Sequence, residues 1–152
     1  MPVVVLFTDT ILTLLSLYRY CSLFEKCPQA KVLFGFPIDI DPNAPELLTS
    51  KRFIMHAAYL VQMLDTALNM LGPDIELLTE IMTELGTKHV RYGVKPEMFP
   101  IMGDALMHTL ETTLKADFTE PVKEAWLQTY SALSQDMIRA QVKAKPRGSK
   151  NQ

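Results

Sequence analysis

The chain contains few of the residues on which small secreted or metal-stabilised proteins depend. Its 152 residues include two cysteines, Cys21 and Cys27, six glycines and three histidines. Two cysteines do not make a disulfide framework, and no CxxC pair or cysteine–histidine spacing typical of structural zinc is present. The sequence therefore favours a reducing, cytoplasmic setting and a fold that depends on its hydrophobic core.

A strong excess of charge of either sign is also missing. The net charge is −2, and the segment 143–152, "KAKPRGSKNQ", holds four cations. A broad basic surface of the kind that neutralises phosphates is absent, which argues against a nucleic-acid-binding protein. With 48% hydrophobic and 21% charged residues, we expect one packed domain over residues 1–142, followed by a disordered basic tail over 143–152.

The sequence has no hydrophobic run long enough to cross a membrane. The most apolar stretch, "VVVLFTDTILTLLSLY" at residues 3–18, is shorter than the ~20 residues that a span requires and contains Asp9. No basic residues precede it and no small-residue cleavage site follows it, as a signal peptide would need. We expect a buried or partner-covered helix here, and no membrane association.

Motifs typical of enzymes are missing as well. The sequence contains no GxSxG, no phosphate-binding glycine loop and no HExxH. Glu80 and Glu84 lie four residues apart on the side of a helix that we expect to face solvent. The nine methionines fall largely on helical stripes, which favours core packing over a soft-metal site.

What the sequence does have is helical periodicity. Apolar residues recur at spacings of three and four, and Ser50, Thr119 and several prolines mark the helix starts. The predicted helices cover about 8–26, a turn around "PQAKVLF", a turn near "PELL" in the connection 35–50, then 51–71, 74–89, a helix from Pro96, and one from about 119. Because no strand-like alternation appears, the fold class is all-α, and the unequal helices favour crossed packing over a strict four-helix bundle.

Two of the three histidines fall on core-facing stripes. His56 follows Phe53 by three residues on helix 51–71, and His89 follows Leu85 by four on helix 74–89. The tight Gly-Pro turn at 72–73 makes these helices antiparallel neighbours, so both imidazoles face the space between them. A single core histidine bonded to a backbone carbonyl is the ordinary interpretation of either one. The pair indicates a slot for a flat apolar group such as haem.

A zinc centre is the weaker interpretation of the same residues. Two histidines are too few for a catalytic zinc ion, which takes three protein ligands. The third, His108, falls among polar residues on its helix, and we predict that it lies at the surface.

Four segments of the chain, taken in order, resemble a known family. They are "LFEKCPQAKVLF", "SKRFIMHAAYLVQMLDTALNML", "LGTKHVRYGVKPEMF" and "MGDALMHTLETTLKADFTEPVKEAWLQTYSAL". Together they resemble the globins, in particular the single-domain, neuroglobin-like and flavohaemoglobin-like branch, from about Tyr20 to Ala140. The resemblance implies a globin-like fold of crossed helices around haem b. The family's first helix has no clear counterpart, residues 1–9 are atypical, and the apolar surface thereby left open would favour a homodimer.

The resemblance assigns roles to positions of this chain. His89 matches the proximal histidine that bonds iron. His56 matches the distal histidine, which either faces the ligand or binds the iron as a sixth ligand. Tyr20 and Leu60 match further positions of the ligand pocket. The other matching positions would contact the haem: Phe34 against the porphyrin, Val94 and Phe99 at its proximal edge, and Lys88, with Arg91 as a weaker candidate, at its propionates.

Three functions remain open at this point. The first is reversible binding of dioxygen or another diatomic gas, as carrier, store or sensor. The second is an enzyme of the nitric oxide dioxygenase type, served by a separate reductase; a distal Tyr20 would favour it by tightening dioxygen binding. The third is a helical interaction module without haem, in which His56 and His89 are ordinary core residues.

Overall fold

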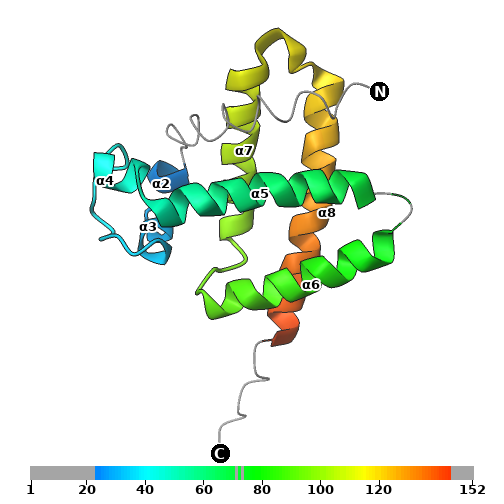
Figure 1. Cartoon of the computed structure of the whole chain (residues 1–152), viewed down its shortest axis with the longest axis horizontal. Coiled ribbons are helices and arrows are strands. Elements are labelled where there is room, and N and C mark those ends of the chain that lie inside the picture. The colour runs from blue at the N-terminus through cyan, green and yellow to red at the C-terminus, as the bar shows by residue number, and fades with distance from the viewer. Residues whose placement is uncertain (1–22, 71, 73, 145–152) are drawn as a thin grey trace, which may run out of the picture.

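The computed structural model describes residues 23–70, 72 and 74–144, and over these residues it contains helices and no strand. The all-α prediction is therefore confirmed. The elements are α2 (Leu23–Lys26), α3 (Gln29–Leu33), α4 (Pro45–Leu48), α5 (Lys51–Met70), α6 (Ile75–Arg91), α7 (Met98–Leu114), the 3₁₀ helix η2 (Lys115–Asp117) and α8 (Glu120–Ala144) (Figure 1).

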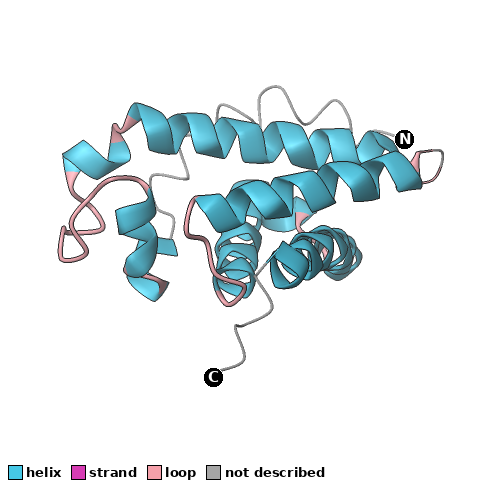
Figure 2. Ribbon diagram, turned by 90° about the horizontal axis from the view of Figure 1, so that it is seen from below, coloured by secondary structure: helices cyan, strands magenta, loops and turns pink. Residues whose placement is uncertain are grey.

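The long helices form two crossed layers. Helices α5 and α6 make one layer, and the antiparallel pair α7 and α8 runs across it in the other (Figures 1 and 2). The short helices α2, α3 and α4 gather at one end of α5 (Figure 1). Because the two layers cross, the prediction of crossed packing instead of a strict four-helix bundle is confirmed.

Helix boundaries follow local sequence signals. The Ser50 hydroxyl accepts a hydrogen bond from the Phe53 amide at 3.4 Å, as an N-cap should. Helix α2 ends at Lys26, just before the predicted stop at Pro28, and α4 is the single turn expected near "PELL". Helix α8 begins at Glu120 and runs to Ala144. The earlier part of the first predicted helix, the atypical residues 1–9 and residues 145–152 lie outside the described residues. Of the tail predicted over 143–152, the first two residues belong to α8 instead.

Two clusters of buried side chains make up the core. The larger one joins α5, α6, α7 and α8, and the smaller one joins α2, α3, α4 and the start of α5, with Ala105 of α7. The predicted apolar stripes supply most of the larger cluster, and Met82 and Met137 are buried in it, as expected of core methionines. Among the described helices, none combines the length and apolarity that crossing a bilayer would require.

Helices α6 and α8 approach each other more closely than side chains normally permit. A Cβ atom built at Gly86 would overlap the backbone carbonyl of Met137. Only glycine therefore fits at this position of α6, because any other residue would force the two helix backbones apart. The contact fixes one side of α6 against α8, one turn before His89.

Candidate functional site

A cavity of about 810 Å³ lies between the two layers of helices. Its lining is mainly apolar and comes from α5, α6, α7 and α8, with contributions from α2 and α3. Six residues predicted from the sequence to form the site line it: Phe34, His56, Leu60, His89, Val94 and Phe99. An apolar cavity with a few convergent polar groups is the usual form of a cofactor site.

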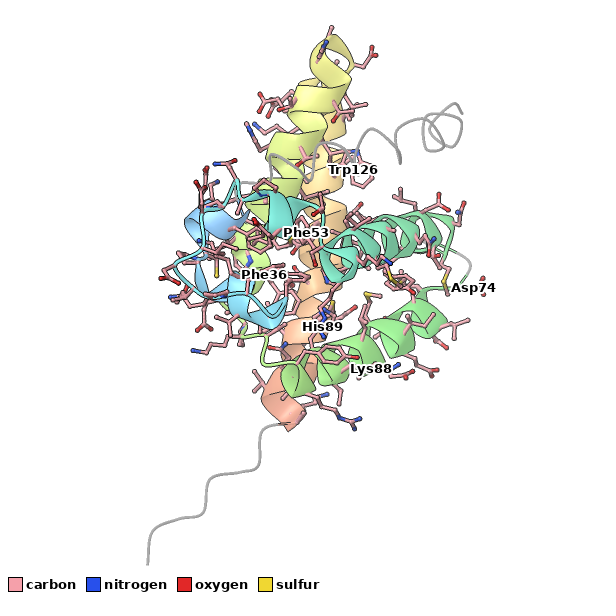
Figure 3. All side chains as sticks on the ribbon, turned by 60° about the vertical axis from the view of Figure 1, so that its left-hand side comes forward. Phe36, Phe53, Asp74, Lys88, His89 and Trp126 are labelled. Carbon is pink, nitrogen blue, oxygen red and sulfur yellow. The ribbon has the colours of Figure 1, made fainter. Side chains whose placement is uncertain are left out.

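His89 faces this cavity with a fixed ring. It projects from α6 toward the space between α6 and α5 (Figure 3). Its Nδ1 lies 2.8 Å from the Leu85 carbonyl oxygen, one turn earlier on the helix. Because a carbonyl oxygen only accepts, Nδ1 carries the proton and donates it. The Nε2 lone pair is thereby left free for a metal.

His56 lies across the cavity from His89, on α5. The centroids of the two imidazole rings are 6.5 Å apart and their planes meet at 66°. The Nδ1 atom of His56 is buried, and no hydrogen-bond partner for it lies among the described residues. A buried polar atom without a partner is costly and often marks a functional position.

Burial keeps both imidazoles neutral. Loss of solvent lowers the pKa of His56 below its ordinary value, and the neighbouring His89 lowers it further. The pKa of His89 is also lowered by burial, against a smaller opposing effect of its hydrogen bond to Leu85. Neutral imidazole is the form that binds metals, so the cavity holds both rings in the state that a ligand requires at neutral pH.

Phe34 occupies the wall beside His56. Its ring centroid is 5.4 Å from that of His56 and 5.2 Å from that of Phe53, edge to face in both cases. The segment after α3 is pinned from inside, because the buried Lys31 donates from Nζ to the carbonyls of Ile38 at 3.2 Å and Ile40 at 2.7 Å. This clamp holds the turn that carries Phe34 against the cavity.

Val94 and Phe99 lie at the corner between α6 and α7. The ring of Phe99 is 6.1 Å from that of His89. The Tyr130 hydroxyl donates to the Phe99 carbonyl at 2.8 Å, and burial raises the pKa of Tyr130. The wall of the cavity beside His89 is thus tied to α8.

The cation at the cavity is not the one expected from the sequence. Lys88 is absent from the lining, lies on a different side of α6 from His89, and its Nζ is 2.8 Å from Glu84 Oε1 (Figure 3). This contact raises the pKa of Lys88 and lowers that of Glu84. Arg52 lines the cavity instead.

Sequence reasoning missed three polar residues at this site. Arg52, Tyr59 and Tyr92 line the cavity while remaining exposed, so they lie at its mouth. Arg52 and Tyr59 stand four residues before and three after His56, on the same side of α5. That spacing was the signal that could have identified them.

Tyr20, His108, Glu80 and Glu84 were also singled out in the sequence. Tyr20 falls outside the described residues. His108 is exposed, as predicted, and so are Glu80 and Glu84. Within 23–70, 72 and 74–144, no group of three or more histidine, cysteine or acidic residues gathers as a metal site. The two facing histidines are accordingly suited to a metal that brings its own equatorial ligands, as the iron of haem does.

Comparison with known proteins shows to which family the chain belongs. The family profile described as Globin matches residues 19–137. Neuroglobin from Danio rerio is 31% identical over 124 residues, which cover 82% of this chain and 77% of that protein. Neuroglobin from Tetraodon nigroviridis is 30% identical over the same shares of both chains, and Neuroglobin-2 from Oncorhynchus mykiss is 29% identical. With a profile match over most of its length and such relatives, the chain belongs to the globin family.

Proposed function

We propose that this globin binds haem b in the cavity lined by α5, α6, α7 and α8, where His89 would hold the iron, and that it reversibly binds dioxygen or another diatomic gas there. Membership of the globin family supports haem and gas binding in general. The observation that carries the specific proposal is the pair of neutral imidazoles facing each other across an apolar cavity.

The geometry of the pair fits the proposed cofactor. Imidazole–metal bonds are about 2 Å long, so one metal ion between two opposed rings puts their centroids roughly 6 to 6.5 Å apart. The observed separation is 6.5 Å. The surrounding side chains, including Phe34, Leu60 and Phe99, offer the apolar walls that a porphyrin needs.

Haem, when bound, would supply an iron atom at which a diatomic gas binds reversibly. His89 would hold that iron through Nε2, with the ring direction set by the Nδ1 bond to Leu85. Such a second hydrogen bond fixes the tautomer and raises the basicity of the ligating nitrogen. The apolar walls exclude water, which keeps both imidazoles neutral.

His56 is suited to binding the iron reversibly. The ring spacing supports its use as a second axial ligand, while its Nδ1 has no partner among the described residues. No hydrogen bond there would have to break for the ring to swing away. We propose that His56 would either hold the iron from the side opposite His89 or donate a hydrogen bond to a gas bound there.

The cavity mouth is suited to the acidic edge of a porphyrin. The Arg52 guanidinium is an always-charged donor that pairs well with carboxylates. Tyr59 and Tyr92 add hydroxyl donors at the same exposed edge. We assign these three residues, in place of Lys88, to the haem propionates.

The compartment is proposed to be the cytoplasm. Cys27 is a free thiol and buried, with only 4% of its surface exposed. A free buried thiol suits a reducing compartment. Within it, a reversible gas site serves a carrier, a store or a sensor.

The test is the absorption spectrum of the purified protein, as isolated, after reduction, and under carbon monoxide. We expect an intense Soret band that shifts with carbon monoxide, which requires an accessible sixth position. Sharp, split visible bands in the reduced, ligand-free protein would support His56 as the sixth ligand. A purified protein without haem that also fails to bind added hemin would contradict the proposal and favour the interaction module.

A further inference from the structure

The end of α6 is closed by a Schellman motif that includes His89. Gly93 has a positive φ of 86°, and its amide donates to the Val90 carbonyl at 3.0 Å. The Val94 amide donates to the His89 carbonyl, also at 3.0 Å. These are the two bonds that define the motif, and glycine is the usual residue at its left-handed position. The backbone of His89 is thus held by the backbone of Val94.

Val94 is in turn held from α8. The Gln141 side chain is only 1% exposed, and its Nε2 lies 3.4 Å from the Val94 carbonyl oxygen. Since that oxygen can only accept, the amide nitrogen and not Oε1 must face it. A hydrogen-bonded path therefore runs from Gln141 through Val94 to His89.

Packing alone does not account for a glutamine at this position. Its Oε1 is buried, and no partner for it is found among the described residues. Leaving a buried polar atom unsatisfied costs stability, and an apolar side chain of the same length would avoid that cost. The one hydrogen bond that the side chain makes in the described structure is to the corner after His89.

We propose that Gln141 is a positioning residue: it fixes the corner after α6 through Val94 and thereby limits the movement of the helix turn that carries His89, whose ring is itself oriented by the bond to Leu85. This inference rests on the proposed function in taking His89 as the axial ligand. Without the tether, the last turn of α6 would keep its own cap and the contact of Gly86 with α8, but Val94 would lose its hydrogen bond from α8. The imidazole would then approach the iron over a wider range of angles.

The first experiment uses the haem-free protein. Gln141→Met keeps the length of the side chain and removes the donor. We expect the Val94 amide to exchange with solvent up to about fivefold faster; fivefold corresponds to a hydrogen bond of ordinary net strength and is an upper limit, because this bond is long. Gln135→Met is the matched control, because Gln135 is exposed on the same helix and contacts only Ser131 at 3.2 Å among the described hydrogen bonds.

The second experiment uses the haem-loaded ferrous protein and a signal that packing alone would not move. We expect Gln141→Met to shift or broaden the iron–histidine stretching band and to speed haem release, while Gln135→Met leaves both unchanged. The unfolding midpoint should change little, because loss of a long hydrogen bond is offset by removal of the unpaired Oε1.

The outcomes separate the tether from the proposed function. A lower unfolding midpoint with unchanged Val94 exchange and an unchanged band would make Gln141 an ordinary core residue and overturn the inference. If Gln141→Met does not fold, Gln141→Leu is measured in the same way. If His89→Ala keeps the band of the unaltered protein, the proposed function fails; the orienting role of Gln141 then fails with it, while the exchange measurement still reports on the tether itself.

Discussion

Two adjacent sides of α6, one helical turn apart, are packed in opposite ways. Toward α8, Gly86 brings the helix backbone against the carbonyl of Met137 with no room for a side chain. Toward α5, one turn later, His89 faces a cavity of about 810 Å³. One face has no space left, and the other leaves enough for a cofactor.

This difference shows how a helical protein keeps an internal space open. A cavity without support would be filled as neighbouring helices relaxed toward it, since unfilled space costs stability. Close contact with α8 prevents α6 from moving in that way. The contact of Gly86 with α8 thus keeps the cavity beside His89 open. We therefore expect changes at Gly86 to lower stability, and changes at His89 to reduce haem binding with little effect on stability.

Removing His89, the proposed iron ligand, should have the largest effect on haem binding. His89→Ala deletes the proposed axial bond, so stable haem retention should be lost. The haem-free protein should change its free energy of unfolding by less than about 1 kcal/mol, because the ring borders open space. Haem content after gel filtration and urea unfolding of the haem-free protein measure the two effects. A variant with full haem content would contradict the assignment of His89.

Adding one methyl group on the tight face should have the largest effect on stability. Alanine ordinarily stabilises a helix interior relative to glycine, by up to about 1 kcal/mol. At Gly86 we expect the opposite sign, a loss of roughly 1–3 kcal/mol, since the added Cβ must displace the backbone of α8. Thr83→Ala, on the exposed side of the same helix, is the control. A more stable Gly86→Ala variant would show that the helices do not touch there.

Replacing the second histidine should change the iron without weakening the fold. His56→Leu removes a buried Nδ1 that has no partner among the described residues, so the haem-free protein should be as stable as before or more so. The reduced, ligand-free spectrum should change from six-coordinate to five-coordinate. If the resting protein is already five-coordinate, bound dioxygen should leave faster. Unchanged spectra and release rates would place His56 outside the ligand pocket.

Lowering the pH should gradually reduce the stability of the folded protein. The folded protein holds the pKa values of His56 and His89 below the ordinary value of 6.5. As the pH falls below about 6.5, the unfolded chain takes up protons that the folded chain refuses, so stability is lost as the pH falls and is fully present above that value. Urea midpoints of the haem-free protein between pH 7.5 and about 5 test this. The slope should be smaller in His56→Leu; an equal slope would mean that other groups cause it.

Much of the site was visible in the sequence because helical spacing is regular. The steps from Phe53 to His56 and from Leu85 to His89 predicted that both rings face inward, and the structure places them 6.5 Å apart. Assignments that depended on long flexible side chains were less secure. Lys88 reaches Glu84 instead of the cavity, and spacing alone could not choose between those partners.

The sequence by itself determined which residues form helices, which of their faces are apolar, and that two histidines lie on those faces. Each of these depends on contacts between residues close in the chain. The tertiary structure alone decided the close approach of Gly86 to Met137, the bond from Gln141 to Val94 and the placing of Arg52 at the cavity mouth. The first two join residues about fifty positions apart, and all three follow from how whole helices cross. Local spacing contains no information about that angle.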